Sequence, residues 1–192
     1  MEIKKIEGDM CNVYLIKDVI NIVVDAGAKV EEILKITNKV DYIFITHAHF
    51  DHIYYLNDYI KSFNNCKVLL SEQAYNKLEN NNLNAASIFD ADINISVDKE
   101  RVIFINDGDK INELKIDNHF IKLQGHTDCC LGLVIKNHLF LGDVLFFTGI
   151  GRYDLPTGSI KDTMGTQRKL KSLTGVDFIY SGHGVSPFAF KK

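Results

Sequence analysis

Hydrophobic positions along the chain follow two distinct periods, one typical of strands and one typical of helices. Short β-branched runs in "NVYLI" (12–16) and "INIVVD" (20–25) predict two early strands that pair as a hairpin. "VDYIFI" (40–45) is continuously apolar, which predicts a buried strand. Further strands are predicted for "KVLL" (67–70), "RVIFI" (101–105), "HFIKL" (119–123), "LGLVI" (131–135), "HLFLG" (138–142) and "VDFIY" (176–180).

Helical periodicity separates several of these runs. It predicts helices in "AKVEEILKIT" (28–37), "IYYLNDYIKSF" (53–63), "SEQAYNKLE" (71–79) and "SIKDTMGTQRKLKSL" (159–173). Ser71 is the expected N-cap of the third helix, and Ser159 with Asp162 resembles a capping box at the fourth. The asparagine-rich stretch 80–84 predicts a loop, and weak periodicity up to residue 99 predicts a mobile flap. The class is therefore mixed α/β with layered sheets.

Composition narrows the classes of function. The chain has 192 residues and no proline-rich linker, so we expect a single domain over 1–192. Its formal charge of −3 provides no basic field for nucleic acid. The amino-terminal segment lacks the apolar run of a signal peptide, and no segment resembles a membrane span. We therefore expect a cytoplasmic protein without membrane contact, whose four cysteines are reduced.

A cluster of potential metal ligands follows the buried strand at 40–45. The stretch "THAHFDH" (46–52) contains His47, His49, Asp51 and His52. An extended continuation of the strand would place His47, His49 and Asp51 on one side. A helix beginning near Ile53 would then bring His52 round as a fourth group. This arrangement suits two metal ions better than one.

Three more polar groups follow a strand and a glycine. His126 follows "FIKLQG", Asp143 follows "LFLG", and His183 lies in "FIYSGHG". Strand ends are where layered α/β folds build their sites, so we expect all of these groups to meet. His119 and His138 lack this context, and we expect them to be exposed turn residues.

The set T-H-x-H-x-D-H, G-H-T, L-G-D and S-G-H-G resembles the metallo-β-lactamase superfamily, and within it the glyoxalase II-like hydrolases. "LFLGDVLFFTGIGRYDLPTGS" (139–159) resembles that group's G-D-x-L-F and G-R-x-D-x-P-x-G signatures. The likeness spans residues 10 to 184. It implies a four-layer αββα sandwich of two facing mixed β-sheets with helices outside, and a site at one edge of the sheets.

The resemblance also implies a ligand set. One metal ion would bind His47, His49 and His126, and the other would bind Asp51, His52 and His183, with Asp143 bridging them. Zinc is the expected ion, although iron or manganese can occupy such sites. Two divalent ions lower the pKa of a bound water and polarise a carbonyl. Hydroxide formed in this way would attack a thioester such as S-lactoylglutathione or a related small ester, with Asp51 orienting the nucleophile.

Departures from the family pattern leave the roles of several residues undecided at this point. "GHTDCC" replaces the usual proline after G-H-T, so Asp128 either hydrogen-bonds a ligand imidazole or only forms the turn. Cys129 and Cys130 are expected to pack rather than react. Arg152 and Tyr153 would line the substrate mouth, or Arg152 would hold its loop through Asp154. Because eight residues follow Gly184 in this sequence, we expect it to lack the helical glutathione-binding domain that the resemblance to glyoxalase II would otherwise imply.

Two alternative functions remain open. A mono-iron oxidoreductase resembling the persulfide dioxygenases would use His47, His126 and Asp143. A non-catalytic metal-binding domain would use the same groups structurally, but structural zinc is normally closed by four ligands. The sequence leaves the acyl group, the thiol carrier, the native metal and the oligomeric state undetermined.

Overall fold

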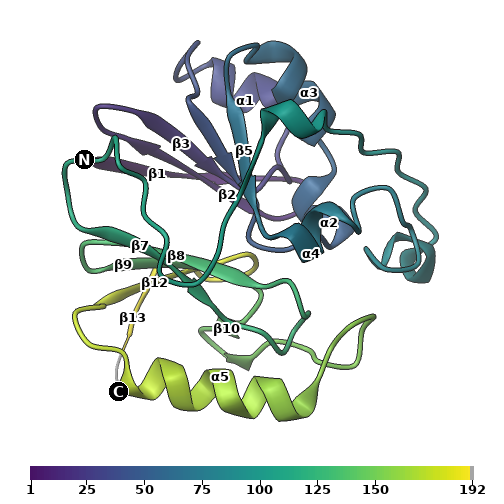
Figure 1. The fold of residues 1–192 in the computed structure, drawn as a ribbon, viewed down its shortest axis with the longest axis vertical. Coiled ribbons are helices and arrows are strands. Elements are labelled where there is room, and N and C mark those ends of the chain that lie inside the picture. The colour runs from purple at the N-terminus through teal and green to yellow at the C-terminus, as the bar shows by residue number, and fades with distance from the viewer. Residues whose placement is uncertain (191–192) are drawn as a thin grey trace.

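The computed structural model describes residues 1–190 and contains two facing β-sheets with helices on their outer sides (Figure 1). The first sheet has six strands in sequence order, antiparallel from β1 to β3 and parallel from β3 to β6. Its strands are β1 (Glu2–Glu7), β2 (Asn12–Lys17), β3 (Asn21–Val24), β4 (Tyr42–Phe44), β5 (Lys67–Leu70) and β6 (Val102–Phe104).

The second sheet has five strands in the order β13-β12-β9-β8-β7, in which only β12 and β9 are parallel. Its strands are β7 (Asn118–Lys122), β8 (Leu131–Ile135), β9 (His138–Gly142), β12 (Phe178–Ser181) and β13 (Phe188–Ala189). A two-stranded ribbon, β10 (Leu145–Phe146) and β11 (Gly149–Ile150), lies between β9 and β12 in the chain.

The helices cover the outer faces of the sheets. The first sheet carries α1 (Val30–Leu34), α2 (Phe50–Ile53), α3 (Leu56–Ser62) and α4 (Glu72–Tyr75), and the second carries α5 (Ile160–Ser172) (Figure 1). Two short 3-10 helices, η1 (Ala86–Phe89) and η2 (Lys99–Arg101), lie between β5 and β6. The expected caps form, because the Ser71 hydroxyl accepts from Ala74 N and the Ser159 hydroxyl from Asp162 N.

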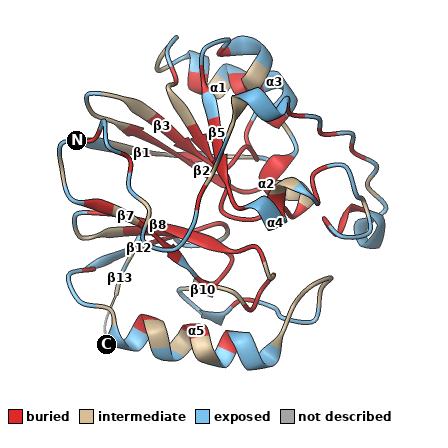
Figure 2. Ribbon diagram, viewed as in Figure 1, coloured by how far each residue is buried: buried red, intermediate tan, exposed pale blue. Residues whose placement is uncertain are grey.

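Helices, two sheets and a further helix form four layers, and an apolar layer lies between each neighbouring pair. Buried residues are concentrated along the strands (Figure 2). Successive side chains of a strand point to opposite faces, so one strand feeds two layers. In β2, Val13 and Leu15 face the helices while Tyr14 and Ile16 face the other sheet. The αββα sandwich predicted from the sequence is thus confirmed.

The predicted hairpin of β2 and β3 is also confirmed. The helix predicted over 53–63 is wrong in its bounds. Helical structure begins earlier, with α2, and it is interrupted near Tyr55 before α3. At the break the His52 carbonyl accepts from Ala26 N at 2.8 Å, and Tyr55 N donates to the Ala26 carbonyl at 2.9 Å. These bonds to the loop after β3 replace helical ones. β1 and the two-residue strands β10, β11 and β13 were not predicted from the sequence.

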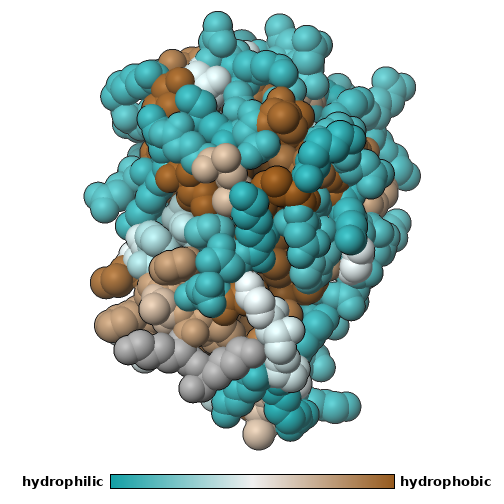
Figure 3. All heavy atoms as spheres, turned by 90° about the vertical axis from the view of Figure 1, so that its left-hand side faces the viewer, coloured by the Kyte–Doolittle hydropathy of each residue, from teal (hydrophilic) through white to brown (hydrophobic). Residues whose placement is uncertain are grey.

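The molecular surface carries both hydrophilic and hydrophobic side chains. Seen from the left-hand side of Figure 1, hydrophilic side chains cover most of the molecule and hydrophobic residues show between them near the middle (Figure 3). Exposure of this kind is ordinary for folded proteins. Within residues 1–190, none of the helices combines the length and the apolar character needed to span a bilayer.

Candidate metal centre

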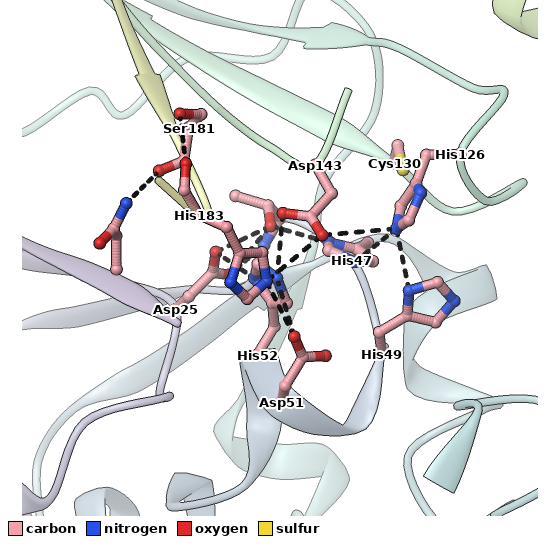
Figure 4. A network of polar contacts seen from close by, with 12 residues as sticks. Asp25, His47, His49, Asp51, His52, His126, Cys130, Asp143, Ser181 and His183 are labelled. Carbon is pink, nitrogen blue, oxygen red and sulfur yellow. Dashed lines mark hydrogen bonds and ion pairs between the residues drawn. The ribbon is translucent and has the colours of Figure 1, made fainter. Parts of the chain in front are cut away.

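All seven ligands expected from the sequence lie together at one edge of the two sheets (Figure 4). Four of them, His47, His49, Asp51 and His52, follow β4 of the first sheet. The other three follow strands of the second sheet: His126 comes after β7, Asp143 after β9 and His183 after β12. The site therefore forms only when the sheets face each other.

The first group consists of three buried histidines. His126 Nε2 lies 3.2 Å from His47 Nε2 and 2.9 Å from His49 Nδ1. Burial lowers the pKa of His49 to about 3, and it also lowers the pKa of His47 and of His126. All three imidazoles are therefore neutral near pH 7, the form that binds metals.

Neighbouring groups fix the tautomers of two of these rings. His126 Nδ1 lies 2.7 Å from the Arg152 carbonyl, which only accepts, so Nδ1 carries the proton. The Thr46 hydroxyl donates to Asp25, so it must accept from His47 Nδ1 at 3.1 Å. The Nε2 atoms of His47 and His126 are consequently unprotonated, and their lone pairs face each other.

The second group contains Asp51, His52, Asp143 and His183, whose ligand atoms lie within 4.8 Å of one another. His52 Nδ1 contacts Asp25 Oδ2 at 2.8 Å, which leaves Nε2 directed at Asp143 Oδ1, 3.3 Å away. His183 Nε2 lies 2.9 Å from Asp51 Oδ2. Asp143 borders both groups, because its Oδ2 lies 3.4 Å from His183 Nε2 and 3.8 Å from His126 Nε2.

These atoms fit bound cations. His52 Nε2 and Asp143 Oδ1 are buried without a hydrogen-bond partner, and such atoms are costly unless something else satisfies them. Burial opposes protonation of His52, but the Cys11 thiol group and the carboxylates of Asp143, Asp25 and Asp51 outweigh burial and raise the pKa of His52. Facing lone pairs in one group and crowded carboxylates in the other are both stabilised by positive charge.

Asp25 also belongs to the candidate site, although it was not identified from the sequence. Its carboxylate accepts from Thr46 N and the Thr46 hydroxyl, and it contacts His52 Nδ1. It thereby helps to fix the orientation of His47 through Thr46 and of His52 directly. The available signal was "VVDAG", in which an aspartate follows a strand as at the other site residues.

The extended path expected for residues 47–51 is wrong for Asp51. β4 ends at Phe44 and α2 begins at Phe50, so the chain turns before Asp51. The turn places Asp51 with His52 rather than with His47 and His49.

His119 and His138 are outside the cluster, but both lie in strands and are half-buried rather than exposed in turns. His138 Nδ1 contacts the Tyr180 hydroxyl at 3.0 Å.

The remaining candidates contact other groups. Asp128 pairs with Lys77 at 2.7 Å rather than with a ligand imidazole. Cys129 and Cys130 are buried in two of the apolar layers, and both sulfurs contact the Thr127 hydroxyl.

Arg152 lines the cavity beside the site, and its guanidinium pairs with Asp154 at 2.9 Å, the contact expected of a residue that holds its loop. Tyr153 is exposed and is not among the residues that line the cavity.

A sandwich of two sheets with histidines and carboxylates at one edge defines a metal-binding α/β protein. The family model of the metallo-beta-lactamase superfamily matches residues 6–183, and the chain belongs to that superfamily. A probable metallo-hydrolase of Methanocaldococcus jannaschii, MJ0888, is 30% identical over 189 residues, covering 92% of this chain and 89% of the relative. Hydroxyacylglutathione hydrolase 1 of Vibrio vulnificus is 31% identical over 166 residues. That match covers 84% of this chain and 57% of the relative's length.

Solved structures share the fold. A B3 metallo-beta-lactamase, BLEG-1, superposes with a TM-score of 0.84 at 24% identity, covering 98% of this chain and 94% of that one. TTHA1623 in a di-iron-bound form superposes with a TM-score of 0.81 at 23% identity and the same coverage. The family is largely hydrolytic, and this chain has the histidine and aspartate cluster typical of its dinuclear sites.

Proposed function

We propose that this protein is a dinuclear metal-dependent hydrolase that cleaves a thioester or a related small ester. One observation carries the proposal: two adjacent groups of ligand atoms share a border at the Asp143 carboxylate. His47, His49 and His126 would hold one ion, Asp51, His52 and His183 the other, and Asp143 would contact both. Zinc fits these nitrogen and oxygen donors, and iron or manganese fits them too.

Two divalent ions bound there would lower the pKa of a coordinated water and polarise a carbonyl oxygen. The residues of the chain supply position and charge. Asp51 lines the cavity, so its carboxylate can accept a hydrogen bond from the attacking water and orient it. Thr46 orients the imidazole of His47, and Asp25 orients that of His52, so that Nε2 of each ring is directed at the site. A thiolate leaves with little protonation because thiols have a pKa near 8.5.

The first test is metal content combined with turnover. Protein prepared without added zinc should contain about two metal ions per chain, and it should hydrolyse S-lactoylglutathione or an acetyl thioester. Asp143→Asn removes the carboxylate that borders both groups, so kcat/KM should fall by more than about 100-fold. His119→Gln, a histidine outside the cluster, is the matched control and should keep normal turnover.

The competing oxidoreductase predicts a different pattern. One iron per chain, with oxygen uptake on glutathione persulfide and no thioester cleavage, would replace the proposed function. Two bound metals with unchanged turnover in Asp143→Asn would also contradict it.

A further inference from the structure

The cavity above the metal centre has an apolar wall. Its volume is about 250 Å³, and Phe50, Ala85, Phe89, Phe146 and Leu155 line it beside the ligand residues. Several apolar side chains from separate segments thus meet beside one small cavity.

The wall is built from elements that the fold holds in place. Phe50 begins α2 and Phe89 ends η1, and their ring centroids are 5.5 Å apart at an interplanar angle of 34°. The Phe50 amide donates to the Asn84 carbonyl at 2.8 Å, which ties the segment before η1 to α2. Asn84 itself is fully buried and donates to the Leu78 carbonyl. Phe89 therefore belongs to an anchored segment although its own side chain is half exposed.

The charges of the cavity are unevenly distributed. Asp51 and Asp143 line it together with His49, His126 and His183. Among the described residues that line the cavity, Arg152 is the one with a cationic side chain other than histidine. Its guanidinium makes two bonds to Asp154, Nε to Oδ1 at 2.9 Å and Nη2 to Oδ2 at 3.0 Å. Asp154 thereby uses two of the guanidinium's N–H donors, so a substrate carboxylate at the wall would meet a cation that already has an anionic partner.

We propose that this wall binds an uncharged, apolar acyl group, so that the preferred substrates are thioesters of short apolar carboxylic acids. The inference rests on the proposed function and names its substrate class. In the reaction the acyl carbon–sulfur bond breaks and a carbon–oxygen bond to the water oxygen forms. The products are the carboxylate, one proton and the free thiol. The carbonyl lies at the metal centre while the acyl chain lies along the phenylalanines.

Thioesters of one small uncharged thiol, N-acetylcysteamine, test the proposal on the metal-loaded protein. The acyl groups are acetyl, butanoyl, hexanoyl and the anionic succinyl, which matches butanoyl in chain length. Each buried methylene should raise kcat/KM about fourfold, the ratio expected from apolar transfer. Butanoyl should exceed succinyl by about tenfold or more, because burying an unpaired carboxylate is costly.

Variants locate the effect. Phe89→Ala should lower the hexanoyl-to-acetyl ratio of kcat/KM by about fourfold or more, because it shortens the wall. Phe147→Ala is the matched control: Phe147 adjoins Phe146 in the chain but is exposed, contacts Phe188 and does not line the cavity. It should leave the ratio unchanged. Asp154→Asn frees Arg152 and should raise the rate with the succinyl substrate.

The outcomes separate this inference from the proposed function. Hydrolysis with a flat acyl profile, or with succinyl equal to butanoyl, would overturn the apolar wall and leave the hydrolase intact. If no thioester is cleaved, the proposed function fails. Calorimetric titration with hexanoate and succinate then tests the wall independently, and equal affinities for the two acids would reject it.

Discussion

The imidazole tautomers at this site are set by residues that bind no metal themselves. The Arg152 carbonyl accepts the Nδ1 proton of His126, and the Thr46 hydroxyl accepts that of His47. Asp25 contacts His52 Nδ1 at 2.8 Å. Each contact leaves Nε2 as the ring nitrogen that faces the cation site, and loss of such a supporting group typically costs about 10- to 100-fold in metal affinity.

Asp25→Asn should selectively weaken binding of the metal ion held by Asp51, His52 and His183. An asparagine amide that donates to His52 Nδ1 would move the proton of His52 to Nε2, and the lone pair directed at Asp143 would be lost. We expect the affinity for that ion to fall by about 10- to 100-fold. Competition with a chromophoric chelator measures the affinity, and the first ion should stay bound.

Asp177→Asn is a suitable control, because Asp177 is exposed and, among the described groups, its carboxylate hydrogen-bonds only to the Asn137 side chain. Two tightly held ions in Asp25→Asn would show that the Asp25 contact does not set the tautomer of His52.

At the scale of elements, the site depends on close approach where strands end. Gly182 follows β12, and a Cβ there would overlap the Asp143 carboxylate and the His52 ring. Gly142 ends β9 with φ of +57° and directs the chain toward Asp143, and a Cβ there would overlap the Thr46 hydroxyl. The strands thus bring carboxylate and imidazole together only because these positions lack side chains.

Gly182→Ala should separate Asp143 from His52 and lower the metal content of purified protein to about one ion per chain or less. Metal analysis by mass spectrometry checks this. Gly165→Ala is the control, because Gly165 lies within α5 and a Cβ there would meet no atom within 4 Å. It should raise the free energy of unfolding by up to about 1 kcal/mol through helix propensity. Full metal content in Gly182→Ala would refute the steric argument.

The elements that could be predicted are those with strong local signals. Continuous apolar runs identified the buried strands, and glycine next to a polar residue identified His126, Asp143 and His183. The interruption between α2 and α3 could not be predicted, because it rests on backbone bonds from His52 and Tyr55 to the distant Ala26. Phe89 was also missed, since its weakly periodic segment is positioned by the buried amide of Asn84 rather than by an amphipathic face.

At the scale of the whole molecule, metal ions would link the two sheets. The ligands after β4 belong to one sheet, and His126, Asp143 and His183 belong to the other. The apolar layer between the sheets, which includes Phe44 and Phe120 with ring centroids 5.1 Å apart, holds them together without any ion. Metal binding should therefore add stability to a fold that forms on its own.

Removal of metal with EDTA should therefore leave the far-ultraviolet circular dichroism unchanged, abolish turnover and lower the melting temperature. A ligand present at 100 times its dissociation constant stabilises the folded state by about 2.7 kcal/mol. For a chain of this length that corresponds to about 5 to 11 °C. Returning zinc, iron or manganese one at a time should restore the melting temperature, and the ion that also restores turnover is the functional one. Loss of the circular dichroism signal on chelation would instead make the metal structural, since the apolar layer alone would then be too weak to hold the sheets together.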